Sequence, residues 1–377
     1  MAIEGFVLNP NILAMPPYTS EKTLEELQEE HGLETIIDLG SNQNPLGPSP
    51  LAMEAVKRAA TGLHCYSSID VAVNQLRCKL AESMGPGFDK DNIIIGNGSI
   101  DVLRMATEVF LYESGESIMR RNAFPMYEVM TKMYGGECVF IESNKDYTCD
   151  LSSIVERITD RTRLVFLTNP DNPTGMIFTQ QELDEFMELV PPSVVVILDH
   201  AYQEYAEAEE YPDVTRYILD RRNVIITRTF SKVYGLAGLR MGYGVARKEI
   251  IEYLSRSRVP FYSGSVAPMA AIAALDDVEH VRLSRKVNAE GKKYLYQKFD
   301  ELDLACVPTQ SYFILLVDLK YDTNAIAEAT LRRGVIVRPC HGFHMPQAIR
   351  VTVGKPEDNE RMVEALRLVL EELEGDS

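Results

Sequence analysis

Lys232 and Arg240 lie in a stretch of the chain whose other residues are mostly small or apolar. Residues 228–243 read RTFSKVYGLAGLRMGY and contain Lys232 and Arg240, directly after the apolar segment 223–227. An isolated lysine is usually a solvated surface charge, but a lysine partly withdrawn from water has a lowered pKa. Its neutral amine is then a nucleophile toward carbonyl carbon. Lys232 is therefore a candidate imine-forming lysine, and the alternative is a structural ion pair with a carboxylate.

Two further polar residues follow apolar segments that are typical of buried strands. Asp199 ends the segment 193–199, SVVVILD, and Asn172 lies in a loop rich in Asn, Pro and Gly after residues 163–168. In open α/β sheets, ligands bind at the carboxyl ends of the strands. We therefore expect Asp199, Asn172 and Lys232 to face one crevice. Taken singly, Asp199 could instead be a helix cap and Asn172 a turn residue.

Two other segments carry groups suited to anions. Residues 96–99, GNGS, precede a helical stretch over 100–110, and a helix N-terminus with glycines can bind an anion, although this motif also forms ordinary turns. In residues 349–353, IRVTV, the apolar residues alternate to one face, which leaves Arg350 and Thr352 on the other. A planar guanidinium can bind a carboxylate through two hydrogen bonds. Arg350 is therefore either a carboxylate ligand or a charge at the rim of the sheet.

The elements that must position these residues alternate along the chain. Between residues 89 and 245, amphipathic helical stretches such as 180–189 separate short apolar segments, and the predicted strands cover residues 92–95, 138–141, 164–167, 194–198, 224–227 and 243–246. This alternation predicts an α/β fold with a mainly parallel central sheet that is covered by helices on both faces.

A different pattern begins beyond about residue 276. A long charged helix over 278–299 leads to strands at 312–317, 335–338 and 349–353, with helices at 323–333 and 356–373. This order predicts a smaller α+β domain. We expect a large domain over residues 51–276 and a small domain that combines residues 1–50 with residues 277–377.

Composition and charge narrow the function classes. The net charge of −18 would repel nucleic acid and anionic lipid, so neither is an expected partner. The longest apolar runs have the length of strands, prolines interrupt the first twenty residues, and the six cysteines form no C-x-x-C pair. These features favour a cytoplasmic location with reduced thiols. His341 and His344 lie in a loop rich in Pro and Gly, and we predict no metal site there.

Three motifs, taken together, resemble a known family. They are NPDNPTG at residues 169–175, DHAY at 199–202 and SKVYGLAGLRMG at 231–242. Their order and spacing resemble those of the aspartate aminotransferase-like (fold type I) enzymes, which use pyridoxal 5′-phosphate. Residues 17–18, 40–50, 96–99 and 349–354 resemble the histidinol-phosphate aminotransferases within that family. These segments run through nearly the whole chain.

The resemblance implies pyridoxal phosphate as the cofactor and gives roles to individual residues. Lys232 would hold the cofactor and act as general base, and Asp199 would pair with the pyridine nitrogen. Asn172 and Tyr202 would hydrogen-bond the phenolic oxygen of the ring, and we count Tyr202 with Lys232 and Asp199 as catalytic. The other implied cofactor contacts are Gly98, Ser99, Thr229, Ser231 and Arg240 at the phosphate, Phe124 on the ring, and Tyr66 from the second subunit of a homodimer. The alternative for Phe124 is a core phenylalanine.

The resemblance also implies a substrate. Arg350 matches the clamp for the α-carboxylate, and Tyr18 and Arg338 match positions that face the distal phosphate of histidinol phosphate. We count Asn172 as a further substrate-binding residue. The implied reaction is transamination between histidinol phosphate and 2-oxoglutarate. The alternatives are an aromatic amino acid aminotransferase, a phosphothreonine decarboxylase, and a catalytically silent protein that binds pyridoxal phosphate.

The chain departs from the pattern of the family in three places. These are residues 19–22, where Pro-Gly is common, His200, where glutamate is usual, and the loop 339–345 with its two histidines. None of the three matches a position that contacts the cofactor. We expect all of them near the substrate end of the site or behind its lining, so they bear on the substrate alternatives.

Overall fold

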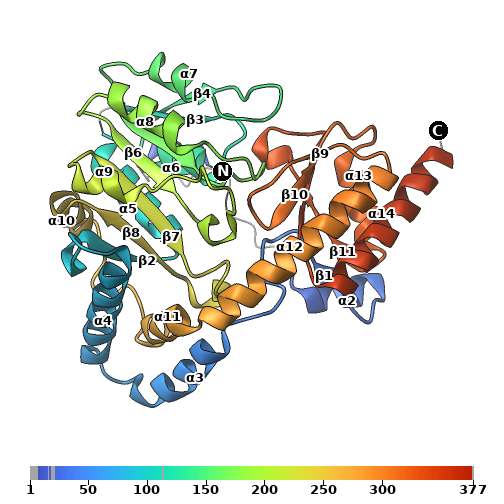
Figure 1. The fold of residues 1–377 in the computed structure, drawn as a ribbon, viewed down its shortest axis with the longest axis horizontal. Helices are drawn as coiled ribbons and strands as arrows, with labels where there is room; N and C mark the ends of the chain where they lie inside the picture. Colours follow the sequence, from blue (N-terminus) through green and yellow to red (C-terminus); the bar gives the residue numbers. More distant parts are fainter. Residues whose placement is uncertain (1–6, 16, 18–21, 113, 376–377) are drawn as a thin grey trace.

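The computed structural model describes residues 7–15, 17, 22–112 and 114–375. Within this part of the chain, no helix combines the length and the apolar character needed to cross a membrane. Two groups of elements lie side by side in Figure 1, with the larger sheet in one group and the C-terminal helices in the other. The first group is called the large domain below and the second the small domain.

A seven-stranded sheet forms the centre of the large domain. Its strand order is β2-β8-β7-β6-β5-β3-β4, and the strands are β2 (Ile93–Asn97), β3 (Glu116–Arg120), β4 (Glu137–Ile141), β5 (Thr162–Thr168), β6 (Val195–Asp199), β7 (Val224–Thr229) and β8 (Met241–Ala246). The five strands β4, β3, β5, β6 and β7 are parallel, and β8 is antiparallel to both of its neighbours. Asp199 and Thr229 therefore end neighbouring strands at one edge of the sheet.

Apolar residues on both faces of these strands explain the layers around the sheet. Val196 and Leu198 pack on one face of β6, and Val195 and Ile197 pack on the other. The first face is covered by α3 (Pro50–Ala59), α4 (Ser67–Met84), α7 (Leu151–Val155), α8 (Gln180–Leu189), α9 (Thr215–Leu219) and α11 (Val266–Asp276). The second is covered by α5 (Ser99–Phe110), α6 (Met126–Met133) and α10 (Lys248–Arg256). The predicted α/β fold with helices on both faces of a mainly parallel sheet is confirmed.

The small domain contains a four-stranded antiparallel sheet of order β12-β13-β10-β9. Its strands are β9 (Cys306–Val307), β10 (Phe313–Leu316), β12 (Arg338–Pro339) and β13 (Ile349–Thr352), and its helices are α12 (Val278–Glu301), α13 (Thr323–Leu331) and α14 (Pro356–Gly375). Helix α12 runs from beside the large domain into the small one (Figure 1). Near the N-terminus, β1 (Ile37–Asp38) pairs with β11 (Val335–Ile336), so this early segment joins the C-terminal elements.

The remaining helical segments are short. Among the described residues, two α-helices precede β1 and five 3-10 turns lie in the connections: α1 (Pro10–Leu13), α2 (Leu24–His31), η1 (Ala60–Gly62), η2 (Lys90–Asn92), η3 (Gln203–Tyr205), η4 (Ala237–Leu239) and η5 (His341–Phe343).

The structure differs from the sequence prediction at several strands: β1, β3 and β9 were not predicted, and the strand predicted over 335–338 is divided. Strand β3 was not predicted, because Glu116 and Arg120 make its ends polar, yet both residues are buried and ion-paired. The single strand predicted over 335–338 is two strands, since Ile336 belongs to β11 and Arg338 belongs to β12, in separate sheets. The choice of pairing partner is a tertiary effect that a short apolar run does not contain.

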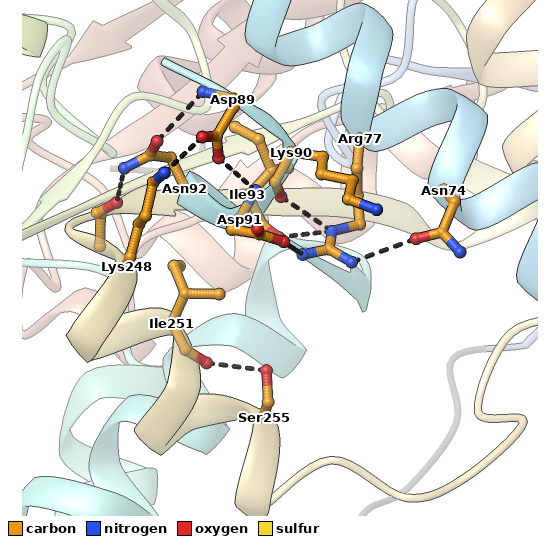
Figure 2. Close-up of polar contacts among 11 residues, drawn as sticks. Asn74, Arg77, Asp89, Lys90, Asp91, Asn92, Ile93, Lys248, Ile251 and Ser255 are labelled. Carbon is orange, nitrogen blue, oxygen red and sulfur yellow. Dashed lines mark hydrogen bonds and ion pairs between the residues drawn. The ribbon is translucent and has the colours of Figure 1, made fainter. Parts of the chain in front are cut away.

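Polar contacts hold the start of the edge strand β2 (Figure 2). Arg77 of α4 donates from Nε to the carbonyl oxygens of Lys90 and Ile93, at 3.0 and 2.9 Å. Asn92 donates from Nδ2 to the carbonyl oxygen of Ala246 on β8, at 2.9 Å. Lys248 pairs with Asp89 beside it. These contacts fix the beginning of β2, and they therefore help to position the GNGS turn at its other end.

Candidate active site

Lys232 lies in the loop between β7 and β8, directly beyond the carboxyl end of β7. Its Nζ donates to the carbonyl oxygen of Asn42 at 3.1 Å and lies 5.5 Å from the centre of the Tyr202 ring. Burial lowers the pKa of Lys232 to about 7, and the positive charges of Arg350 and Arg240 act in the same direction. A substantial share of this amine is therefore neutral near pH 7, as a nucleophile or a general base requires.

Asp199, at the end of β6, is a buried carboxylate with two hydroxyl donors. Tyr127 donates to Oδ2 at 2.8 Å, and Thr227 of the neighbouring strand donates to Oδ1 at 2.9 Å. Burial raises the pKa of Asp199, and the hydrogen bonds from Tyr127 and Thr227 and the charge of Lys232 oppose that rise. The ring of Tyr127 is stacked on Phe166 at 4.6 Å between centroids, so its hydroxyl is held in place. Such a carboxylate is prepared to face a protonated nitrogen.

A second cluster gathers donors around the N-terminus of α5. The hydroxyls of Thr229 and Ser231 are 3.0 Å apart, and Nη1 of Arg240 lies 3.5 Å from the Ser231 hydroxyl. Gly98, the residue before α5, provides no side-chain cap, and a Cβ there would lie only 2.4 Å from Nη2 of Arg240. Glycine at this position thus lets the guanidinium approach the helix N-terminus. Hydroxyls, a guanidinium and a helix N-terminus are together suited to a phosphate group.

Arg350 forms the third part of the site, from β13 of the small domain. Its Nη1 donates to Oδ1 of Asn172 at 2.6 Å, and its Nη2 donates to the carbonyl oxygen of Gly40 at 2.8 Å. The guanidinium also lies 5.3 Å from the ring centre of Phe313 and 5.6 Å from that of Phe343. Arg350 is 5% exposed, and its Nε has no hydrogen-bond partner among the described residues. A buried cation with an unused donor is suited to an anion.

Most of the predicted site residues that the structure describes lie in these clusters. Asn172 contacts Arg350, and Tyr202 receives a long hydrogen bond from Asn42 at 3.5 Å. The ring of Phe124 lies edge-on to Tyr127 at 5.6 Å. Residues that belong with the donors at α5 are Gly98, Ser99, Thr229, Ser231 and Arg240.

Three predicted residues have a different position. Arg338 pairs directly with Arg350 across β12 and β13, so both side chains start from one face of the small sheet. Tyr66, at the start of α4, is 71% exposed and contacts Phe261, with 4.8 Å between ring centroids. Tyr18 lies outside the described residues, so the structure gives no position for it.

Several residues of the site were not predicted, and Gly40, Phe313 and Phe343 around Arg350 are among them. Tyr127 and Thr227 hold Asp199, and Asn42 contacts both Lys232 and Tyr202. Asn42 belongs to the GSNQNP motif, and Tyr127 belongs to the segment that contains Phe124. Each therefore lies in a segment that contributed to the sequence prediction. Thr227 had no signal, because its contact depends on the adjacency of β6 and β7.

Among the departures from the family pattern, His200 lies behind the site and His344 lies where the two domains meet. His200 is buried, its Nδ1 is 2.9 Å from the Tyr211 hydroxyl, and burial lowers its pKa to about 3. His344 lies 3.3 Å from Glu128 of α6, and His341 contacts the hydroxyl of Thr323 at 3.0 Å. Residues 19–21 are outside the described part of the chain.

Comparison with known proteins gives the family. The sequence model of the family described as aminotransferase class I and II matches residues 34–366. The chain belongs to this family. It is accordingly a pyridoxal-phosphate-dependent aminotransferase, as the resemblance of the motifs implied.

Individual relatives are similar in sequence to this chain over almost its whole length. A histidinol-phosphate aminotransferase of Moorella thermoacetica is 44% identical over 95% of this chain and 92% of its own length. One of Akkermansia muciniphila is 41% identical over 98% of this chain and 100% of its own. The crystal structure of a histidinol-phosphate aminotransferase from Sinorhizobium meliloti, in complex with pyridoxal 5′-phosphate, aligns with a TM-score of 0.87 at 26% identity and covers 99% of both chains.

The residues of this chain fit that cofactor. The buried Asp199 suits a protonated pyridine nitrogen, and the amine of Lys232 suits an aldehyde carbon. Gly242 allows the backbone of β8 to pass close to α5, since a Cβ there would lie 2.2 Å from the amide nitrogen of Ser99. A nitrogen partner, an amine and a phosphate cup are the three contacts that pyridoxal phosphate needs.

Proposed function

We propose that the enzyme transfers the amino group of histidinol phosphate to 2-oxoglutarate, which gives imidazole-acetol phosphate and glutamate. The observation that carries this choice of substrate is the placement of Arg338 directly opposite Arg350 on antiparallel strands. The relatives named histidinol-phosphate aminotransferase, at 37 to 44% identity, support the same choice.

Two arginines at paired positions repel one another. Like charges directly opposite in a sheet are destabilising, and the charge of Arg338 adds to the burial that lowers the pKa of Arg350. Their paired positive charges favour a ligand that is doubly anionic and contacts both guanidinium groups. A phosphate dianion meets that requirement and binds guanidinium groups through paired hydrogen bonds. Histidinol phosphate carries such a group close to its amine, whereas phenylalanine carries one carboxylate and an apolar ring.

For the cofactor, we propose contacts from the clusters around Lys232, Asp199 and Arg240. Asp199 would face the pyridine nitrogen, Phe124 the ring, and Asn172 and Tyr202 the phenolic oxygen. The phosphate would be held by Gly98, Ser99, Thr229, Ser231 and Arg240, which are supported by their position around the N-terminus of α5.

Each group contributes one task to the reaction. Bound pyridoxal phosphate supplies an aldehyde for the substrate amine and an acceptor for the electrons left when the α-proton departs. Asp199, whose anionic form the Tyr127 and Thr227 hydroxyls favour, would hold a proton on the nitrogen that faces it. Lys232 takes the α-proton at Nζ, because its pKa of about 7 leaves much of the amine neutral. Arg350 orients the anionic end of the substrate.

Assembly into a homodimer is part of the proposal. Tyr66 and Phe261 are 71% and 53% exposed, and Leu63 and Val259 nearby in sequence are each 64% exposed. An exposed apolar cluster of this kind is typical of a protein interface. In the dimer, Tyr66 would reach the cofactor phosphate of the second copy. This arrangement would be contradicted if light scattering showed a monomer and kinetic assays showed that the monomer is fully active.

We also propose the domain boundaries 51–276 for the large domain and 1–50 plus 277–377 for the small domain. With these boundaries the chain passes between the domains twice, once after residue 50 and once after residue 276. The two passages lie close together, because the Ser49 hydroxyl donates to Oδ2 of Asp277 at 2.6 Å. The six free cysteines support a cytoplasmic location, and the net charge of −18 argues against nucleic acid and anionic membranes as partners.

The experiment that tests the substrate is a direct comparison of two amino donors. kcat/KM is measured for histidinol phosphate and for phenylalanine, each with 2-oxoglutarate as acceptor. We expect histidinol phosphate to be preferred by at least about tenfold, the effect of one charge-assisted contact. Equal rates, or a preference for phenylalanine, would contradict the proposal and favour an aromatic amino acid aminotransferase.

A further inference from the structure

A buried ion pair lies directly below the loop that carries Asn172. Arg120, at the end of β3, places Nη1 3.0 Å from Oδ2 of Asp171, and the two side chains are only 6% and 5% exposed. A buried charge pair is weak evidence for stability, because the desolvation of both charges offsets their attraction. The pair is therefore better explained by the residues that it holds in place than by a gain in stability.

Asp171 is the centre of the turn that presents Asn172. Its Oδ2 also accepts a hydrogen bond from the Thr174 hydroxyl at 2.7 Å, and its amide donates to the carbonyl oxygen of Met176 at 2.8 Å. Its own carbonyl oxygen accepts from the amide of Gly175 at 2.8 Å. One carboxylate thus organises residues 171–176, and Arg120 fixes that carboxylate from the sheet below.

The same arginine reaches a second loop. Its Nη2 donates to the Ser143 hydroxyl at 2.6 Å and to the carbonyl oxygen of Tyr147 at 3.0 Å. Ser143 in turn donates to Asn122 at 2.7 Å, and Asn122 lies 3.5 Å from the sulfur of Met345 in the small domain. Both loops that Arg120 holds contact the small domain, one through Asn172 and Arg350 and the other through Tyr147, which packs against the cluster that contains Val307 and Cys340.

We propose that Arg120 is a positioning residue for transamination. Its ion pair with Asp171 holds Asn172 at the distance that keeps Arg350 oriented toward the substrate, although Arg120 lies outside the reacting groups. The inference rests on the proposed role of Arg350 and Asn172. It adds a residue of β3, a strand that the sequence did not reveal, to the substrate end of the site.

The main test compares Arg120→Met and Arg120→Lys with the wild-type enzyme loaded with its cofactor. For Arg120→Met we expect the KM for glutamate to rise about tenfold while kcat changes by less than about threefold. Lysine keeps the charge and should recover most of this loss. Arg121→Met is the matched control, because Arg121 is the next residue and its ion pair with Glu142 is largely exposed, at 43% and 70%. It should leave both constants unchanged.

A double-mutant cycle separates positioning from a general loss of structure. If Arg120 acts through Asn172 and Arg350, Arg120→Met should add little to the KM of Arg350→Met, so the two effects are not additive. Where Arg120→Met leaves too little folded protein because Asp171 is unpaired, Arg120→Met with Asp171→Asn removes both charges and replaces it in the cycle. A second readout is the affinity of the cofactor-free protein for 2-oxoglutarate by calorimetry, which should fall with KM.

The outcomes distinguish the two proposals. Additive effects in the cycle, or equal losses of kcat and 1/KM without rescue by lysine, would refute the positioning role and leave the proposed function intact. If Arg350→Met alone left the KM for glutamate unchanged, the carboxylate site itself would be wrong, and the route from Arg120 to it would be refuted as well.

Discussion

Asp199 and Arg350 are both buried charged groups of the site, but different parts of the chain hold them. Asp199 receives its hydrogen bonds from Tyr127 and Thr227, both of the large domain and 72 and 28 residues away in sequence. Arg350, in the small domain, donates to Asn172 and to Gly40, which are 178 and 310 residues away. One end of the site is therefore built within the large domain, and the other is built where the two domains meet.

This difference separates the two properties of the enzyme. The large domain sets the charge and position of the groups that face the cofactor, so changes there should act mainly on kcat. The substrate end depends on several segments that converge on one guanidinium, so changes there should act mainly on KM and on the choice of substrate. Variants at each end of the site should therefore differ in which kinetic constant they change.

The largest effect is expected for Lys232→Ala. The variant loses both the amine that bonds the cofactor and the base that moves the α-proton, and general acid-base catalysis alone contributes about 10² to 10⁴. We expect turnover to be abolished while the cofactor still binds without a covalent bond, as measured by dialysis and visible absorption. Lys292→Ala is the control, since burial also lowers the pKa of Lys292, which lies in α12 beside Glu207. Near-normal turnover of Lys232→Ala would refute the assignment.

The next effect is expected for Asp199→Asn. An amide cannot stabilise a protonated nitrogen as a carboxylate does, so kcat should fall by about 10² or more, the loss of one preorganised electrostatic contact. The KM for glutamate should change little. Tyr127→Phe removes only one of the two hydroxyl donors to this carboxylate and should cost about tenfold in kcat. Wild-type rates in single-turnover assays of Asp199→Asn would contradict the role of this residue.

At the substrate end, Arg350→Met and Arg338→Met should differ by substrate. Arg350→Met should raise the KM for glutamate and for histidinol phosphate, because both carry an anionic group that this residue would bind. Arg338→Met should raise only the KM for histidinol phosphate, by an amount equivalent to roughly 1.5 to 3 kcal/mol. Steady-state kinetics with both donors measures the contrast. If Arg338→Met were neutral toward histidinol phosphate, the pocket for a distal phosphate would be wrongly placed.

Much of this architecture could be predicted from local sequence. The apolar segments before Asp199 and Lys232 are strands, and the alternation of residues 349–353 places Ile349 and Val351 in the core while Arg350 faces Asn172. These successes have one physical cause. A strand between two layers of helices needs apolar residues on both of its buried faces, so a run of adjacent apolar residues predicts it.

The failures depend on partners that are distant in sequence. Strand β3 begins with Glu116 and ends with Arg120, and their charges are compensated by Arg161 and Asp171. Similarly, Thr227 meets Asp199 only because β6 and β7 are neighbours in the sheet. Strand order and buried ion pairs are tertiary properties, so no local pattern in residues 116–120 predicts them.

The two ends of the site also interact, and pH can measure that interaction. The pKa of Lys232 is lowered to about 7, below the ordinary value of about 10.4 for lysine, so the reactive neutral amine should predominate above about pH 7. In the cofactor-free protein, the rate of Lys232 acylation, followed by peptide mass spectrometry, should rise with a midpoint near pH 7. Arg350→Met removes a positive neighbour and should move this midpoint upward. A midpoint near pH 10 in the wild-type protein would show that the amine is not desolvated.

The smallest effect is expected for His200→Gln, although His200 directly follows Asp199. Burial lowers the pKa of His200 to about 3, and the charge of Arg228 acts in the same direction. The imidazole therefore stays neutral above about pH 3 and has no charge to lose between pH 5 and pH 8. Glutamine can still hydrogen-bond the Tyr211 hydroxyl, which the imidazole contacts at 2.9 Å. We expect kcat within about twofold of wild type, a stability change of about 1 kcal/mol, and an unchanged pH–rate profile. If an ionisation between pH 5 and pH 8 disappeared from that profile, His200 would be a titrating part of the cofactor end rather than a neutral support behind it.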